Sequence, residues 1–116
     1  MSAEIERLKS SLAKFAKDRD WEQFHTPKNL AMAMSVEAAE VVEIFQWLTE
    51  RQSRELGKPK ISELADELAD TYIYLLRIAA QYDIDLVDAA TRKLRKSALK
   101  YPVHKARGSA KKYTEF

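Results

Sequence analysis

Four acidic residues in two pairs are the part of this sequence best suited to chemistry. Glu37 and Glu40 lie three residues apart, and Glu67 and Asp70 repeat this spacing after 26 intervening residues. Residues three apart on a helix lie on the same face, so each pair presents two carboxylates side by side. Two antiparallel helices would bring the pairs together, and four clustered anions require cations.

The helical wheel makes the first pair unusual. At about 100° per residue, Glu37 and Glu40 fall within the apolar stripe of their helix, whereas Glu67 and Asp70 fall at the edge of theirs. A buried, ionised carboxylate without a partner costs several kcal/mol or has a raised pKa. We therefore expect a cation to compensate these acids.

Three kinds of cation compete for this cluster. Lys or Arg side chains from the basic fourth helical stretch could form a buried ion-pair network. A di-iron site would need Glu-x-x-His pairs, and the sequence has one match, Glu22 with His25, outside the expected helix. Mg²⁺ is a hard cation that takes oxygen ligands and keeps waters and phosphates in its shell. The all-oxygen set suits Mg²⁺ best.

Helix start and stop signals divide the chain into four helical stretches. We expect them to run from Ser2 to about Asp20, from Thr26 to Gly57, from Ser62 to Tyr82, and from Asp85 to Tyr101. Residues 103–116 show no periodicity. The connections are short, so the pattern predicts an all-α fold, an antiparallel four-helix bundle in a single domain over residues 1–116, with an irregular basic tail over residues 103–116.

Composition narrows the function classes. The 116 residues carry 20 Lys and Arg against 18 Asp and Glu, a net charge of +2 that does not mark a general nucleic-acid or membrane-surface protein. The absence of Cys excludes disulfides and thiolate nucleophiles and is typical of a cytoplasmic protein. We expect neither a signal peptide nor a membrane helix, because no apolar run approaches about 20 residues.

The charges are sorted along the chain although their sum is small. Residues 37–70 contain nine acids against four bases, whereas residues 89–114 contain nine Lys or Arg and no acid. One segment can hold cations, and the other can meet anions such as phosphates.

Blocks along nearly the whole chain resemble one family. In order they are RDWEQF, HTPKNL, EAAEVVEIFQW, ELADTYIYLL and YPVHKARGSAKKYTEF. Together with E-x-x-E followed by E-x-x-D, they resemble the all-α nucleoside triphosphate pyrophosphatases of the MazG-like superfamily, and the dCTP pyrophosphatase branch in particular. The resemblance implies Mg²⁺-dependent hydrolysis of a nucleoside triphosphate, dCTP or a base-modified relative, to the monophosphate and pyrophosphate.

The resemblance also implies roles for individual residues. The Mg²⁺ ligands and catalytic acids would be Glu37, Glu40, Glu67 and Asp70. Trp21 and His25 match contacts to the base and phosphates, Trp47 matches an aromatic residue that closes over the base, and Tyr74 matches a tyrosine that contacts the substrate. Independently of the resemblance, the basic tail would supplement the metal on the outer phosphates through Lys105, Arg107 and Lys112, because Lys and Arg pair with phosphate oxygens. A homo-oligomer, with a tetramer favoured, is implied as well.

Two positions depart from the family pattern, and two other functions stay open. Leu12 replaces a histidine near the nucleotide, and Ser97 replaces an asparagine before the Tyr-Pro pair. Both positions bear on base preference.

A phosphoribosyl-ATP or dUTP-type pyrophosphohydrolase would share the acids but differ in the base pocket. A helical module that binds nucleic acid without catalysis is the third reading, and acids on an apolar stripe argue against it. We expect no stable nucleic-acid partner.

Overall fold

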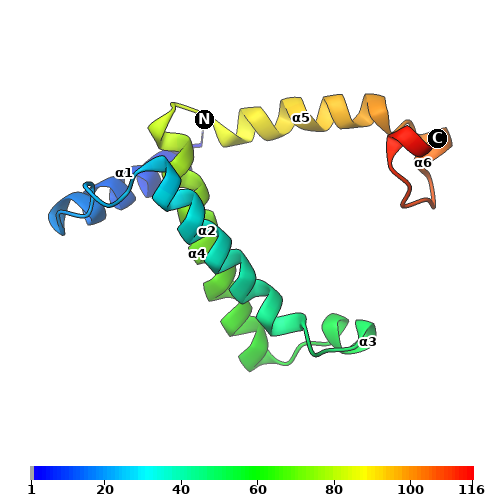
Figure 1. The fold of residues 1–116 in the computed structure, drawn as a ribbon, viewed down its shortest axis with the longest axis horizontal. Helices are drawn as coiled ribbons and strands as arrows, with labels where there is room; N and C mark the ends of the chain where they lie inside the picture. Colours follow the sequence, from blue (N-terminus) through cyan, green and yellow to red (C-terminus); the bar gives the residue numbers. More distant parts are fainter. Residues whose placement is uncertain (1) are drawn as a thin grey trace. The chain divides into compact units, whose positions relative to one another are not determined.

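The computed structural model of the chain describes residues 2–116 and consists of helices joined by short turns (Figure 1). No strand occurs among the residues described, so the predicted all-α class is confirmed. The elements are α1 (Ala3–Asp18), α2 (Pro27–Phe45), α3 (Glu50–Arg54), α4 (Lys58–Gln81), α5 (Leu86–Lys100), α6 (Val103–Ala106) and a 3₁₀ helix, η1 (Tyr113–Glu115).

The chain divides into two compact units, the first ending at Asp83 and the second comprising Ile84–Phe116. In the first unit, α2 and α4 lie side by side and run in opposite directions, and α1 packs against α4 (Figure 1). The buried core of this unit consists of Ala16, Leu30, Leu76 and Ala79. The closed four-helix bundle and the single domain over residues 1–116 stay predictions.

The start of α2 is as predicted, but its end is not. The Thr26 hydroxyl accepts a hydrogen bond from the backbone N–H of Asn29 at 3.2 Å, and Pro27 follows at the first helical position. The helix was expected to continue to Gly57, yet it ends at Phe45. Thr49 and Gln52 form a capping box that begins the separate helix α3, with bonds of 3.1 and 3.0 Å. The apolar pattern alone did not reveal this restart.

The expected start of the next helix is also wrong. Its cap was predicted at Ser62, but α4 begins at Lys58, with Gly57 in the cap position and Pro59 in the first turn. A proline is tolerated there because the first amide groups of a helix need no intrahelical acceptor. Pro59 therefore begins a helix where we expected it to end one.

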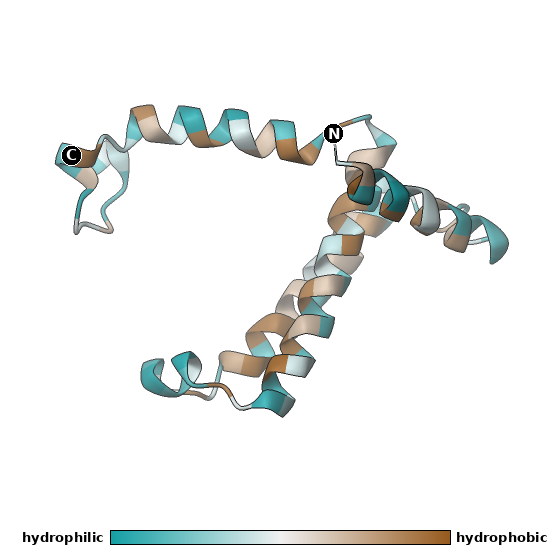
Figure 2. Cartoon of the chain, turned by 180° about the vertical axis from the view of Figure 1, so that it is seen from behind, coloured by the Kyte–Doolittle hydropathy of each residue, from teal (hydrophilic) through white to brown (hydrophobic). Residues whose placement is uncertain are grey.

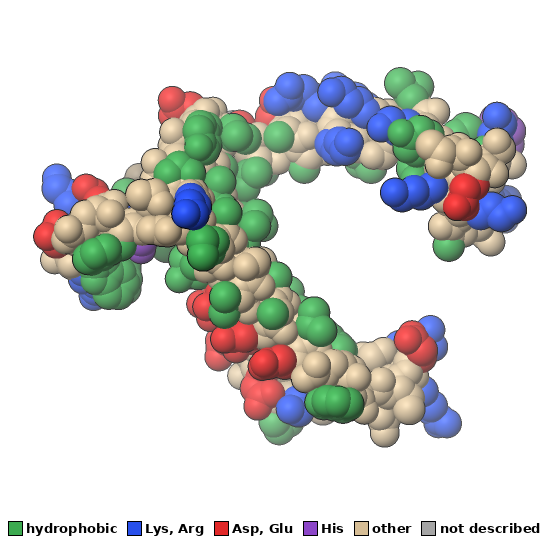
Figure 3. All heavy atoms as spheres, viewed as in Figure 1, with side chains coloured by type: hydrophobic (Ala, Val, Ile, Leu, Met, Phe, Trp, Pro, Cys, Tyr) green, Lys and Arg blue, Asp and Glu red, His purple; other side chains and the backbone are tan. Residues whose placement is uncertain are grey.

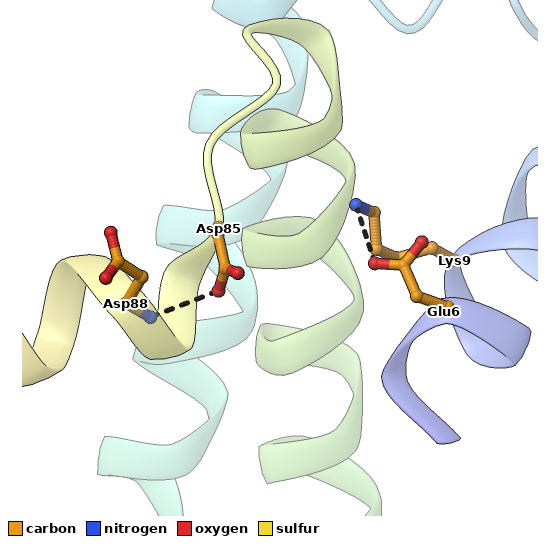
Figure 4. A network of polar contacts seen from close by, with 4 residues as sticks. All are labelled: Glu6, Lys9, Asp85 and Asp88. Carbon is orange, nitrogen blue, oxygen red and sulfur yellow. Dashed lines mark hydrogen bonds and ion pairs between the residues drawn. The ribbon is translucent and has the colours of Figure 1, made fainter. Parts of the chain in front are cut away.

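Caps elsewhere follow the sequence more closely. The Asp85 carboxylate accepts from the backbone N–H of Asp88 at 3.1 Å and caps α5 (Figure 4). Ser2 occupies the cap position of α1, although its side chain makes no capping hydrogen bond. Figure 4 also shows the Lys9–Glu6 ion pair of α1, with 3.5 Å between Nζ and Oε1.

The C-terminal tail is more ordered than predicted. Residues 103–116 contain α6 and η1 as well as irregular segments. The ring of Tyr101 meets the rings of Tyr113 and Phe116 edge-on, with 5.8 Å between centroids in each pair. The Lys100 Nζ atom lies 4.8 Å from the Tyr113 ring centroid. Aromatic contacts to the end of α5 thus organise a segment whose sequence has no helical period.

Apolar surface remains exposed on both units. Hydrophobic residues run along α2 and α4 and alternate with hydrophilic ones on α5 (Figure 2). No residue of α5 is buried, and its Leu94 and Leu99 side chains are 71% and 84% exposed. Between residues 2 and 116, none of the helices is long and apolar enough to cross a membrane.

Candidate active site

The two acidic pairs meet between α2 and α4. Glu37 of α2 and Glu67 and Asp70 of α4 each place a carboxylate oxygen within 4.8 Å of the others. Glu37, Glu40 and Glu67 are half-buried, whereas Asp70 is exposed. Acidic side chains gather along the α2–α4 pair (Figure 3). The antiparallel arrangement of the two long helices therefore brings acids from distant parts of the sequence into one group, here called the acid cluster (Glu37, Glu40, Glu67 and Asp70).

The acid cluster perturbs its own protonation. A hydrogen bond to Glu40, burial and the nearby negative charges raise the pKa of Glu67 to about 7. A hydrogen bond to Glu40, followed by burial, also raises the pKa of Glu37. Hydrogen bonds from Glu67 and Glu37 lower the pKa of Glu40. Glu40 is therefore the carboxyl group that ionises most readily of these three. The cluster thus holds a proton near neutral pH when no cation is bound.

The donor set fits a divalent cation better than the alternatives. Oε2 of Glu37 and Oε2 of Glu67 are buried and have no hydrogen-bond partner. Between residues 2 and 83, no Lys or Arg pairs with any acid of the cluster; the acids that do pair there are Glu6, Asp18, Glu55 and Glu63. The group also contains no histidine, which a di-iron site would need. Unsatisfied carboxylate oxygens are suitable ligands for Mg²⁺.

A cavity of about 370 Å³ opens beside the acid cluster. Its walls combine acidic, aromatic and aliphatic side chains, namely Leu12, Phe15, Ala16, Trp21, His25, Glu37, Asp70, Ile73, Tyr74 and Arg77. The structure therefore brings Trp21, His25 and Tyr74, which the sequence nominated for substrate contacts, into one cavity with two of the acids. Leu12, the departure from the family pattern, lines the same cavity.

The loop between α1 and α2 holds Trp21 at this cavity. The backbone N–H of Trp21 donates to the carbonyl of Ala16 at 2.9 Å, and its ring meets Phe15 edge-on with 5.7 Å between centroids. The Gln81 Nε2 atom donates to the His25 carbonyl at 3.2 Å, which ties the loop to the end of α4. Trp21 keeps 43% of its surface exposed, so part of its ring remains accessible to a ligand.

Comparisons with known proteins agree with this geometry. Residues 32–116 match the sequence model of the MazG-like family. The chain belongs to this family. It is similar to dCTP pyrophosphatase 1 of Mus musculus and of Homo sapiens, at 41% and 42% identity over 113 residues, or 96% of this chain and 66% of each relative. It thus spans slightly less than two thirds of these MazG-like relatives.

A solved structure extends the likeness to the fold. The crystal structure of a pyrophosphatase from Archaeoglobus fulgidus matches this MazG-like chain with a TM-score of 0.82 at 38% identity. The match covers 88% of this chain and 95% of that chain. The resemblance identified from the sequence blocks is therefore confirmed at the level of family and fold.

Four of the residues nominated for substrate contacts do not line the cavity. Trp47 lies in the turn between α2 and α3 and is 86% exposed. The three basic residues of the tail belong to the second unit: Lys105 lies in α6, Arg107 follows it, and Lys112 precedes η1. Their substrate contacts stay predictions.

Arg77 lines the cavity of this MazG-like chain and was missed by the sequence reasoning. Its Nε atom is buried without a hydrogen-bond partner. Burial and the positive charge of Arg77 lower the pKa of His25, whose Nδ1 atom is also buried and lacks a partner. One signal in the sequence could have found it: Arg77 lies seven residues after Asp70, on the same helical face.

Proposed function

We propose that this MazG-like protein hydrolyses a nucleoside triphosphate, dCTP or a base-modified relative, to the monophosphate and pyrophosphate. One observation carries the proposal: two carboxylates and a partly exposed tryptophan line a single cavity. This combination suits a ligand with a polyanionic end and an aromatic end. The printed names of the relatives, dCTP pyrophosphatase 1 and a pyrophosphatase, support the same reaction class.

The acid cluster would hold Mg²⁺ through Glu37, Glu40, Glu67 and Asp70. When bound, Mg²⁺ neutralises phosphate charge and favours in-line attack by water on the phosphoanhydride. A carboxylate oxygen of the cluster that does not contact the ion would orient the attacking water and accept its proton. The bond that breaks is the one between the α and β phosphates, and pyrophosphate leaves. No covalent intermediate with the protein is needed.

The remaining cavity residues would bind the nucleoside. Trp21 offers a ring for base stacking, and His25 and Tyr74 offer polar contacts from the loop and from α4. Trp47 would close over the base, and Lys105, Arg107 and Lys112 would contact the outer phosphates. The assignment of Trp47 rests on the family resemblance, and that of the three tail residues rests on the pairing of Lys and Arg with phosphate oxygens.

Self-association is part of the proposal. The apolar side chains exposed on α2 and α5 need further burial, which a homo-oligomer, with a tetramer favoured, would provide. We also propose that residues 1–116 act as one domain in the cytoplasm, without a stable nucleic-acid partner. Size-exclusion chromatography with light scattering would test the oligomer.

A pyrophosphate-release assay over a panel of nucleoside triphosphates tests the function. Purified protein should release pyrophosphate from dCTP with Mg²⁺ and lose this activity in excess EDTA. Release of single phosphates, or full activity in EDTA, would contradict the mechanism. Preference for dUTP or phosphoribosyl-ATP would favour the alternative activities of the same fold. Salt-dependent nucleic-acid binding without turnover would favour the binding module instead.

A further inference from the structure

Arg77 and His25 form a polar corner in a cavity whose other walls away from the acids are mostly apolar. Both also line a neighbouring hollow of about 420 Å³, which Glu22 and Gln81 border. The Arg77 Nε and His25 Nδ1 atoms are buried and have no hydrogen-bond partner. Buried polar atoms without partners cost stability, so an unpaired donor and an unpaired ring nitrogen at one corner indicate a ligand that pairs with them.

The position of Arg77 on α4 indicates which part of the ligand reaches it. Arg77 follows Asp70 by seven residues, which is two helical turns and about 10 Å along the axis. Tyr74 lies between them on the same face, and Trp21 faces the same cavity. If the acid cluster and its cation hold the phosphates, the opposite end of the nucleotide extends along α4 towards Arg77. The group that meets the guanidinium is then the base.

We propose that Arg77 is a specificity-determining residue, which recognises the hydrogen-bonding edge of a cytosine-type base with help from His25. This inference rests on the proposed function for the identity of the ligand as a nucleotide. The guanidinium has five N–H donors and no acceptor. Cytosine presents two adjacent acceptors, O2 and N3, and one donor, its amino group. Arg77 would donate to O2 and N3, and Nδ1 of His25 would accept from the amino group.

The same arrangement disfavours uracil and thymine. Both carry a hydrogen on N3, so a donor of the base would face a donor of Arg77, and O4 would replace the amino group opposite His25. A site built to hydrogen-bond one pattern rejects the wrong pattern because its polar groups stay unpaired. The lowered pKa of His25 keeps its ring neutral, as an acceptor nitrogen requires.

Kinetics with two substrates test this role. The values of kcat and KM are measured for dCTP and dUTP with wild type, Arg77→Gln, Arg77→Lys and a control, Arg7→Ala, from the exposed side of α1. We expect Arg77→Gln to lower kcat/KM for dCTP by roughly 10- to 100-fold, mainly through KM, and to change dUTP far less. Arg77→Lys keeps the charge but loses the planar fork, so it should also lose selectivity. Arg7→Ala should match wild type.

Equal losses for dCTP and dUTP would overturn the proposal, because Arg77 would then contact the phosphates or support the fold. Helix content from circular dichroism shows whether each variant folds. If Arg77→Gln does not fold, the selectivity of Arg77→Lys decides, and wild-type selectivity in that variant contradicts the inference.

Binding without turnover separates this inference from the proposed function. Calorimetric titration with dCMP and dUMP in Mg²⁺ should show a preference for dCMP that Arg77→Gln abolishes. If wild type hydrolyses no triphosphate but shows this Arg77-dependent preference, the activity is wrong and the base recognition stands. If wild type hydrolyses dCTP but binds dCMP and dUMP equally, the activity stands and the role of Arg77 is wrong.

Discussion

Glu67→Gln tests whether the acid cluster of the folded protein binds a proton near neutral pH. If it does, the folded protein loses stability as the pH rises and this proton dissociates. The pKa of Glu67 is raised from 4.5 to about 7 in the folded protein, so at pH 6 the folded state carries about 0.9 of a proton there. The unfolded chain carries almost none. Between pH 4.5 and about 7 the folded state therefore binds more protons, and the free energy of unfolding that Glu67 contributes falls as the pH rises.

Scanning calorimetry without divalent metal, from pH 4.5 to 8, measures this effect. We expect the Tm of wild type to fall relative to that of Glu67→Gln as the pH rises to about 7. Above that pH the difference in Tm should become constant. Glu63→Gln is a matched control, because Glu63 lies one turn earlier on α4 in an exposed ion pair with Lys60 at 3.3 Å. The control should keep the wild-type pH profile. A Tm difference that stays constant across the window would refute the shared proton.

The same proton should appear in metal binding. A cation that binds the carboxylates must displace it, so Mg²⁺ affinity should rise with pH. Titration calorimetry in two buffers of different ionisation enthalpy should detect release of about 0.9 proton per Mg²⁺ at pH 6 and about 0.1 at pH 8. Glu67→Gln should release fewer protons than wild type, because the variant has lost the carboxyl group with the pKa of about 7. Mg²⁺ binding to wild type without proton release at pH 6 would show that Glu67 is not in the site.

Three further substitutions probe separate parts of the first unit. Glu37→Gln should leave the metal-free protein equally or more stable while abolishing turnover, because no basic partner is stranded; a loss of about 3–5 kcal/mol in calorimetry would reveal a structural ion pair instead. Trp21→Ala should weaken nucleotide binding by roughly 1–3 kcal/mol with unchanged helix content, and an unchanged KM would remove Trp21 from the base site. Thr49→Ala should lower the free energy of unfolding by about 0.5–2 kcal/mol through loss of the capping box. Denaturant unfolding measures this change, and an unchanged free energy of unfolding would contradict the role of the box.

The long helices and their acids were predictable because a single physical pattern determines them. The 3.6-residue period and the spacing of three place each acidic pair on one face, and the Thr26 cap determines where α2 begins. The antiparallel packing of α2 on α4 was expected from a short connection, but residues 46–57, which include α3, join the two helices. These features depend on residues close together in the sequence.

The errors arose where two local signals competed or where distant residues met. The Thr49–Gln52 capping box interrupts an apolar pattern that reads as continuous, and Pro59 is compatible with both the end and the first turn of a helix. The tail has no helical period, and the aromatic contacts to Tyr101 that organise it join residues more than ten positions apart. Such contacts cannot be derived from hydropathy along the chain.

Arg77 and Glu37 show opposite ways in which a site residue relates to its helix pattern. Glu37 breaks the pattern, since a carboxylate occupies the apolar stripe, and the structure leaves one of its oxygens buried without a partner. Arg77 does not stand out in the sequence pattern of α4, because a long basic side chain on a helix ordinarily extends its charge to solvent. Only the burial of its Nε atom beside His25 distinguishes it. The acid cluster can therefore be located from the sequence, because a carboxylate departs from the apolar pattern of its helix. The polar corner formed by Arg77 and His25 can be found only from the structure, which shows which loop covers which end of α4.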